Sequence, residues 1–156
     1  RIDSLFFNED GTIQKVIPTL RGVGITKATD KIQVDRYSGI SNEGVSVAFL
    51  DTLDRFRGWK TFLEKPGAWI RYNTVDFGSE QLNKLRVKAS SETGGALEIR
   101  LDHAYGPLLS EIEIPENTNW KIIESPLSMA PDGIRHLVVV QKGDGPVEVD
   151  WVRFIH

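Results

Sequence analysis

The chain has 156 residues, of which 40% are hydrophobic, and 19 Lys and Arg stand against 22 Asp and Glu to give a formal net charge of −3. This small negative charge, without a long Lys/Arg block, argues against nucleic acid or an anionic membrane as a partner. The lack of Cys excludes disulfide scaffolds, thiolate zinc sites and a cysteine nucleophile.

Hydrophobic alternation with period two dominates the sequence, and it places alternate side chains on opposite faces of a sheet. In the clearest case Leu97, Ile99 and Leu101 are predicted to face a core. Other strands are predicted, in chain order, at 31–37, 45–50, 69–77, 82–89, 108–114, 120–124, 134–141 and 147–155. The sequence thus predicts an all-β fold, a β-sandwich jelly roll of two antiparallel sheets. Four aromatic residues are expected mostly in its core: Trp69, Phe77, Trp151 and Phe154.

Residues 51–65 are the exception, because the spacing of their apolar residues is typical of a helix. Their apolar residues recur about every third position: Leu53, Phe56, Trp59, Phe62 and Leu63. Gly58 weakens a helix, and Pro66-Gly67 ends the segment. The segment therefore fits a short helix or an ordered loop equally well. The longest apolar runs, such as 137–140, are far shorter than the ~20 residues of a membrane-spanning helix.

No catalytic signature is present: the sequence has no Gly-rich phosphate loop, no Gly-x-Ser-x-Gly elbow and no His-Glu-x-x-His. Close acidic pairs such as Glu111/Glu113 could be imagined as the two carboxylates of a glycosidase. With so many acidic residues, such pairs arise by chance, and solvated strand edges explain them better. We therefore expect this chain not to be an enzyme.

Aromatic side chains in or beside loops suit the apolar face of a sugar ring. Trp120 is the first candidate, because it follows the polar, turn-prone loop 115–119 at the edge of a predicted strand. Trp59, Phe62 and Tyr105 are further candidates, although each also fits an ordinary packed side chain.

Several blocks of the sequence, in their order and spacing, resemble family 6 carbohydrate-binding modules. They are Ile32-Gln33-Val34-Asp35-Arg36-Tyr37-Ser38-Gly39, Asn73-Thr74-Val75-Asp76-Phe77-Gly78, Leu85-Arg86-Val87-Lys88-Ala89-Ser90, Gly94-Gly95, Glu98-Ile99-Arg100-Leu101-Asp102, Pro115 with Trp120, and Asp150-Trp151. The resemblance covers about 31–156 and implies a calcium-bearing β-sandwich.

This resemblance implies a sugar site among loops at one sheet edge. Trp120 matches the family's stacking Trp, and Phe62 or Trp59 would supply the facing ring. Glu148 stands where the family has an Asn, and Thr118-Asn119 replaces its Gly-Gly. An ionised carboxylate accepts hydrogen bonds but cannot donate them. The candidate carbohydrate-binding residues are Trp120, Phe62, Trp59, Glu148, Asn119 and Tyr105.

The resemblance also implies a structural calcium ion held by Gln33, Asp35 and Asp150. All three offer oxygen ligands, which calcium prefers, but Gln33 brings no charge. The alternative is a hydrogen-bonded polar cluster that holds the terminal strands together.

The preceding segment, 5–13 with Pro18-Thr19 and Gly22-Val23, resembles the tail of a family 43 glycoside hydrolase domain. We therefore expect residues 1–26 to be a junction with an upstream catalytic domain and residues 27–156 to be the module. The chain begins with Arg, which suggests an excised fragment.

The leading functional expectation is a non-catalytic module that holds an extracellular or periplasmic arabinan- or xylan-acting hydrolase on plant polysaccharide. The alternative is an accessory sandwich that packs on the catalytic domain without binding sugar. A third possibility, an independent polysaccharide-cleaving sandwich, has little support.

Overall fold

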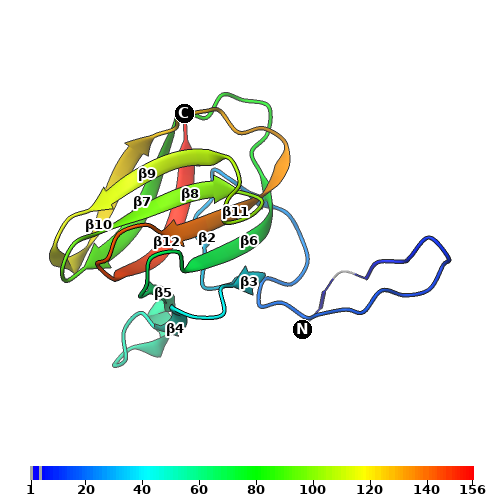
Figure 1. Cartoon of the computed structure of the whole chain (residues 1–156), viewed down its shortest axis with the longest axis horizontal. Helices are drawn as coiled ribbons and strands as arrows, with labels where there is room; N and C mark the ends of the chain where they lie inside the picture. The colour runs from blue at the N-terminus through cyan, green and yellow to red at the C-terminus, as the bar shows by residue number, and fades with distance from the viewer. Residues whose placement is uncertain (1, 4) are drawn as a thin grey trace.

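The molecule is a sandwich of two packed six-stranded β-sheets (Figure 1). The computed structural model describes residues 2–3 and 5–156. The first sheet, termed the β8 sheet, has the order β1 (Thr26–Lys27), β6 (Trp69–Asp76), β11 (Ile134–Gln141), β8 (Gly95–Leu101) and β9 (Leu108–Ile114), with β3 (Gly39–Ile40) also paired to β6. The second, termed the β12 sheet, has the order β10 (Asn117–Pro126), β7 (Lys84–Ser91), β12 (Val147–Ile155), β5 (Trp59–Leu63) and β4 (Val45–Phe49), with β2 (Ile32–Gln33) also paired to β12. The predicted all-β sandwich is confirmed.

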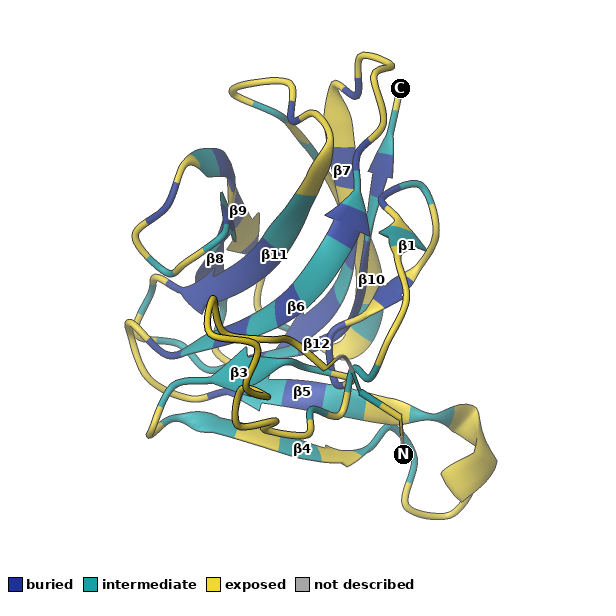
Figure 2. Ribbon diagram, turned by 90° about the vertical axis from the view of Figure 1, so that its right-hand side faces the viewer, coloured by how far each residue is buried: buried dark blue, intermediate teal, exposed yellow. Residues whose placement is uncertain are grey.

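Alternate residues of the strands form the core between the sheets, as the period-two pattern predicts. Leu97 and Leu101 on β8 and Leu85 on β7 are fully buried, and Figure 2 shows buried stripes alternating with partly exposed ones along the strands. Phe77 and Phe154 also belong to the core and meet edge to face, with ring centroids 5.0 Å apart. Their apolar area holds the two sheets together.

The other two aromatic residues differ: Trp151 is buried as expected, although it lies outside the cluster between the sheets, whereas Trp69 is only half-buried. Trp151 is only 7% exposed, but its register partner is Lys88 on the outer face of the β12 sheet, and the ammonium of Lys31 lies 5.1 Å from its ring centroid. An irregularity of register just before Trp151 changes which face its side chain occupies. Trp69 is half-buried and alternates with the buried Ile70. The expectation of a core position was wrong for Trp69, whereas Trp151 is buried on the outer face of its sheet. Alternation alone does not reveal the bulge that places it there.

Residues 51–65 contain a three-residue 3-10 helix, η1 (Arg55–Arg57), and then strand β5. The apolar residues at helical spacing do not form a buried face, since Leu53 and Phe56 are 97% and 102% exposed. Pairing with β4 on one side and β12 on the other holds β5 extended. The helix alternative was wrong beyond the single turn of η1, and the loop alternative was wrong for residues 59–63, because β5, which contains Phe62, is a strand. No helix of the described residues is long and apolar enough to cross a bilayer.

The described residues before β1, 2–3 and 5–25, form an arm that projects from the sandwich (Figure 1). Arg21 anchors it: the guanidinium lies 4.6 Å from the ring centroid of Tyr72, and Nε donates to the backbone oxygen of Asn73 over 3.3 Å. The arm exposes many apolar side chains, among them Ile2, Leu5, Phe6, Phe7, Ile13, Ile17, Val23 and Ile25. The arm is thus tied to the sandwich at its base and adds little to the core.

We predict that Phe154→Ala lowers the free energy of unfolding by about 3 to 5 kcal/mol, because it removes a fully buried ring from between the sheets. Urea unfolding followed by circular dichroism measures the change. Tyr105→Ala is the control, because this 92% exposed ring should contribute less than about 0.5 kcal/mol. Equal losses in the two variants would contradict the assignment of Phe154 to the core.

Candidate functional site

A row of side chains crosses the outer face of the β12 sheet. The register pairs Ser46 with Phe62, Phe62 with Glu148, and Glu148 with Ser90. Phe62 and Glu148 each lie between two fully buried neighbours, so their own side chains point away from the core. Because partners on adjacent strands share one face, the four side chains are consecutive neighbours. The structure therefore brings together two of the predicted carbohydrate-binding residues, Phe62 and Glu148.

Glu148 is held by two polar partners. Nζ of Lys60 lies 2.6 Å from Oε1 of Glu148, and Oγ of Ser90 donates to Oε2 over 3.3 Å. Lys60 reaches the same face as Phe62 because the two residues are two apart on β5. The side chains of Lys60 and Glu148 are 23% and 27% exposed. The ion pair is thus partly sheltered but still open to a ligand.

A pocket of about 210 Å³ opens at one end of this row. It is lined by Phe62, Ser90, Ser91, Glu92, Thr93, Thr118, Pro146 and Glu148. The volume lies below the roughly 300 to 1,000 Å³ of sites that enclose a drug-sized molecule. An aromatic ring and a proline ring supply apolar surface, and hydroxyl and carboxylate groups supply polar contacts. Such a lining suits a ligand unit with one apolar face and a hydroxylated rim.

Trp120 stands beside the pocket without lining it. Its half-buried indole lies over the ammonium of Lys88, 5.7 Å from the ring centroid. Lys88 is two residues before Ser90 on β7 and therefore shares its face. Asn119 is exposed in the same stretch, where β10 loses regular register with β7. The structure thus places both predicted residues next to the row that contains Phe62 and Glu148.

Trp59 lies on the opposite side of β5 from Phe62. Its ring stacks on Phe49 with centroids 4.1 Å apart, and it lines a different pocket together with Val47 and Arg36. Trp59 and Phe62 are three positions apart, and an odd number of positions along a strand reverses the face of a side chain. Phe62 and Trp59 were the two alternatives for the ring that faces Trp120. Only Phe62 lies on the same face of the sheet as Trp120.

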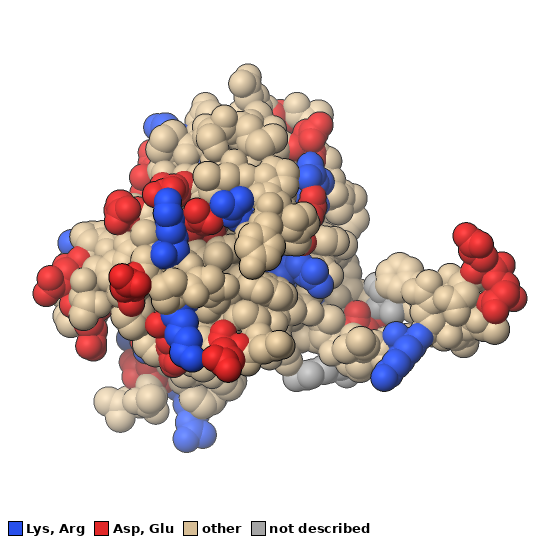
Figure 3. All heavy atoms as spheres, viewed as in Figure 1, with Lys and Arg blue, Asp and Glu red and all other residues tan. Residues whose placement is uncertain are grey.

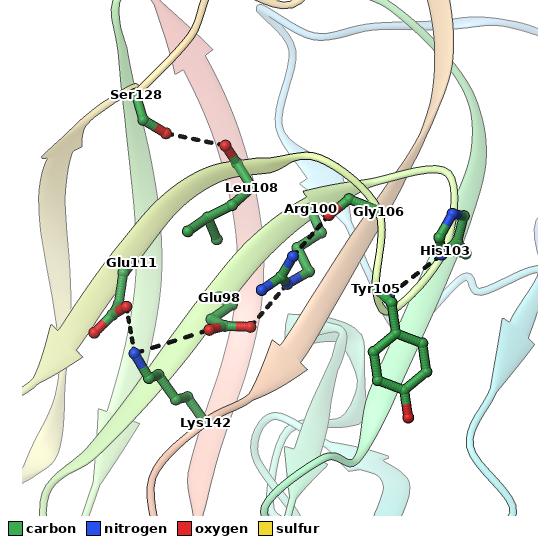
Figure 4. Close-up of polar contacts among 9 residues, drawn as sticks. All are labelled: Glu98, Arg100, His103, Tyr105, Gly106, Leu108, Glu111, Ser128 and Lys142. Carbon is green, nitrogen blue, oxygen red and sulfur yellow. Dashed lines mark hydrogen bonds and ion pairs between the residues drawn. The ribbon is translucent and has the colours of Figure 1, made fainter.

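Tyr105 belongs to the other sheet, in the connection between β8 and β9 (Figure 4). The outer face of that sheet carries interspersed acidic and basic groups (Figure 3). Arg100 Nε lies 2.8 Å from Glu98, and Lys142 bridges Glu98 and Glu111. These groups satisfy one another, and the structure does not bring Tyr105 to the pocket beside Phe62.

The candidate calcium ligands come together only in part. Asp35 and Asp150 are each 7% exposed, and Asp35 Oδ1 has no hydrogen-bond partner in the described structure. Burial raises the pKa of Asp35 to about 6, and the negative charge of Asp150 adds to the rise. Lys88 Nζ lies 2.8 Å from Oδ2 of Asp150. Gln33 is exposed on β2, and within residues 2–3 and 5–156 no three His, Cys, Asp or Glu side chains form a group suited to a metal.

Two residues of the site, Lys60 and Ser90, were missed from the sequence. The helical interpretation of 51–65 concealed Lys60, because only a strand places it on the face of Phe62. Ser90 continues the alternation of β7, in which Leu85 and Val87 are buried and Arg86 and Lys88 are not. Extending that alternation by one step would have identified Ser90.

Comparison with known proteins connects this geometry to a family. Residues 41–156 match the family described as carbohydrate binding module (family 6). An arabinoxylan arabinofuranohydrolase of Paenibacillus polymyxa is 29% identical over 82 residues, which are 51% of this chain and 13% of that protein. The chain therefore corresponds to a small part of this relative's length.

Two solved structures show the same fold. A family 6 module from Clostridium stercorarium in complex with cellobiose has a TM-score of 0.74 at 22% identity, and the match covers 84% of this chain and 96% of that one. A family 43 arabinoxylan arabinofuranohydrolase from Bacillus subtilis in complex with cellotetraose has a TM-score of 0.75 at 22% identity, and the match covers 99% of this chain and 33% of that one.

Proposed function

The chain belongs to carbohydrate-binding module family 6, and from this premise we propose that it binds plant cell-wall polysaccharide or oligosaccharide without cleaving it. In this proposal Phe62 and Trp120 provide flat apolar surfaces, Glu148 provides a polar contact, and Asn119 borders the site. Stacking and a few hydrogen bonds give weak affinity for a single site. Weak binding is useful when it raises the local concentration of an attached hydrolase on an insoluble polymer.

The observation that carries this proposal is the pocket that joins Phe62 to Glu148 on adjacent strands. An aromatic side chain and a fixed carboxylate lie within one opening, and Trp120 stands on the same face. Trp59 and Tyr105 are not needed, since they lie on other surfaces.

A second function, an accessory sandwich without sugar binding, is favoured by one observation. Glu148 is already occupied by Lys60 and Ser90, and a polar group with all its partners inside the protein gains less from a ligand. The two proposals differ in whether the chain binds any oligosaccharide.

We predict that isothermal titration calorimetry with xylo-, arabino-, cello- and galacto-oligosaccharides detects binding by the native chain. Trp120→Ala and Phe62→Ala should each weaken it by about 2 kcal/mol or more, as expected for an anchoring aromatic ring. Tyr105→Ala is the matched control on another surface and should bind normally. Native affinity in both Trp120→Ala and Phe62→Ala would refute this site, and the absence of binding to every sugar would favour the accessory sandwich.

We also propose a structural calcium ion at Asp35 and Asp150, with Gln33 as a further oxygen donor. The fit rests on the unpartnered Oδ1 of the buried Asp35, which needs a cation or a proton. When bound, calcium supplies positive charge to the two carboxylates. Asp35 follows β2 and Asp150 lies in β12, so these residues would then help to fasten β2 to the last strand.

Calcium should therefore raise the melting temperature of the chelator-treated protein, because a ligand that binds only the folded state stabilises it. Differential scanning calorimetry in EDTA and in excess calcium measures the shift. Asp35→Asn should abolish the response, whereas Gln33→Glu should enlarge it by adding a charge. An unchanged melting temperature of the native chain in both solutions would exclude the metal.

We further propose that the chain is part of an exported glycoside hydrolase of the arabinofuranosidase or xylosidase type, acting on arabinan or xylan outside the cytoplasm. The Bacillus subtilis enzyme matches 99% of this chain, whereas the separate Clostridium stercorarium module matches 84%. The arm, with its exposed apolar side chains, would then pack on the catalytic domain as the junction at residues 1–26, in which Arg1 and Ser4 lie outside the described residues.

This role predicts that the arm contributes little to the stability of the sandwich. Deletion of residues 1–18, which keeps the Arg21 anchor, should leave both the melting temperature and the oligosaccharide affinity unchanged. Thermal melting and calorimetry test this directly. A large loss of stability in the truncated chain would show that the arm belongs to the module rather than to a junction.

A further inference from the structure

The pocket beside Phe62 has a shortage of hydrogen-bond donors. Glu148, its central polar group, accepts hydrogen bonds but cannot donate when ionised. Of the four lining hydroxyls, those of Ser90, Ser91 and Thr93 already donate to protein oxygens, which leaves the exposed hydroxyl of Thr118. A sugar hydroxyl both donates and accepts hydrogen bonds, so a pocket with so few free donors satisfies only part of that capacity.

Further donors lie next to the pocket, on Lys60, which does not line it but contacts the lining residue Glu148. Its ammonium carries three N–H groups, and one of them is directed to Glu148 at 2.6 Å. Two N–H groups remain for a ligand, and the exposed fractions of 23% and 27% show that both members of the pair can be reached from solvent. The pair is fixed across two strands, so the ammonium and the carboxylate present a donor and an acceptor at a defined spacing.

We propose that Lys60 is a specificity-determining residue, and that Lys60 and Glu148 bind neighbouring hydroxyls of an uncharged sugar as one donor–acceptor unit. This inference rests on the proposed sugar-binding function. The class of ligand follows from charge. Glu92 and Glu148 line the pocket, whereas Lys60 lies beside the lining and Lys88 is paired with Asp150. A uronate group would therefore meet net negative charge and compete with Glu148 for Lys60.

Two other roles of the pair make different predictions. If the pair only joined β5 to β12, it would contribute little to the free energy of folding, as partly exposed ion pairs do. Either single substitution would then leave the sugar affinity unchanged. If it blocked the pocket, removing either partner would strengthen binding. The donor–acceptor role is asymmetric, because only the loss of Lys60 removes the donors.

The test is a set of variants titrated with the best-binding neutral oligosaccharide of the calorimetric series. Lys60→Met keeps the apolar stem but removes the ammonium donors and leaves the Glu148 carboxylate as an acceptor only. It should weaken binding about tenfold or more. Glu148→Gln carries a donor and an acceptor in one neutral amide of the same shape. Both Glu148→Gln and the double variant Lys60→Met/Glu148→Gln should therefore bind within about threefold of the native chain.

Lys65→Met is the matched control, because Lys65 forms a similar 2.9 Å ion pair with Glu43 that lies outside the pocket. It should bind as the native chain does, and thermal melting checks that every variant is folded. The class of sugar is tested by oligogalacturonate, which the native chain should not bind and Glu148→Gln should bind more strongly.

Native affinity in Lys60→Met, with binding still lost in Phe62→Ala, would overturn this inference and leave the proposed function standing. Equal weakening in Lys60→Met and in the double variant would also overturn it, because the amide would then have failed to replace the pair. Tight binding of oligogalacturonate by the native chain would overturn the assignment to uncharged sugars. If no neutral oligosaccharide binds the native chain, the proposed function and this inference fall together.

Discussion

The hydrogen-bonded register of β5, β12 and β7 is the constraint on which the site depends. It places Phe62, Glu148 and Ser90 side by side on one face. A slip of one residue in β5 would move Phe62 into the core and Lys60 away from Glu148, since side chains alternate between faces. The buried residues of these strands prevent such a slip, because they fit the core in only one register. The packing that stabilises the sandwich therefore also positions the polar groups of the pocket.

The charged side chains on the two outer faces of the sandwich lie in different surroundings. On the β8 sheet, Lys142 bridges Glu98 and Glu111, and Arg100 holds Glu98 (Figure 4). On the β12 sheet, the pair of Lys60 and Glu148 adjoins a pocket with an aromatic wall. A charge pair becomes useful for recognition where apolar surface and open volume lie beside it. This combination distinguishes the candidate site from the rest of the charged surface.

Much of the fold could be predicted from the sequence, because strands with one buried face carry the signal in their own residues. The alternation of Leu97, Ile99 and Leu101 is such a case. The strand β5 could not be recognised, because it is only five residues long. The exposed apolar residues before it, Leu53 and Phe56, also have a spacing typical of a helix. The burial of Trp151 was predicted, but the face on which it is buried was not, because a bulge changes the face of a side chain without a clear sign in the sequence.

Trp120 and Phe62 could be named as candidates from their positions in or beside predicted loops, whereas Glu148 was named only through the resemblance. The contact between Lys60 and Glu148 joins residues 88 positions apart, and no local pattern encodes such a pair. An amide chemical-shift titration of the native chain with a neutral oligosaccharide tests the account most directly. The account predicts that the largest shifts occur at Phe62, Ser90 and Glu148. Largest shifts on the outer face of the β8 sheet, or no shifts at all, would contradict it.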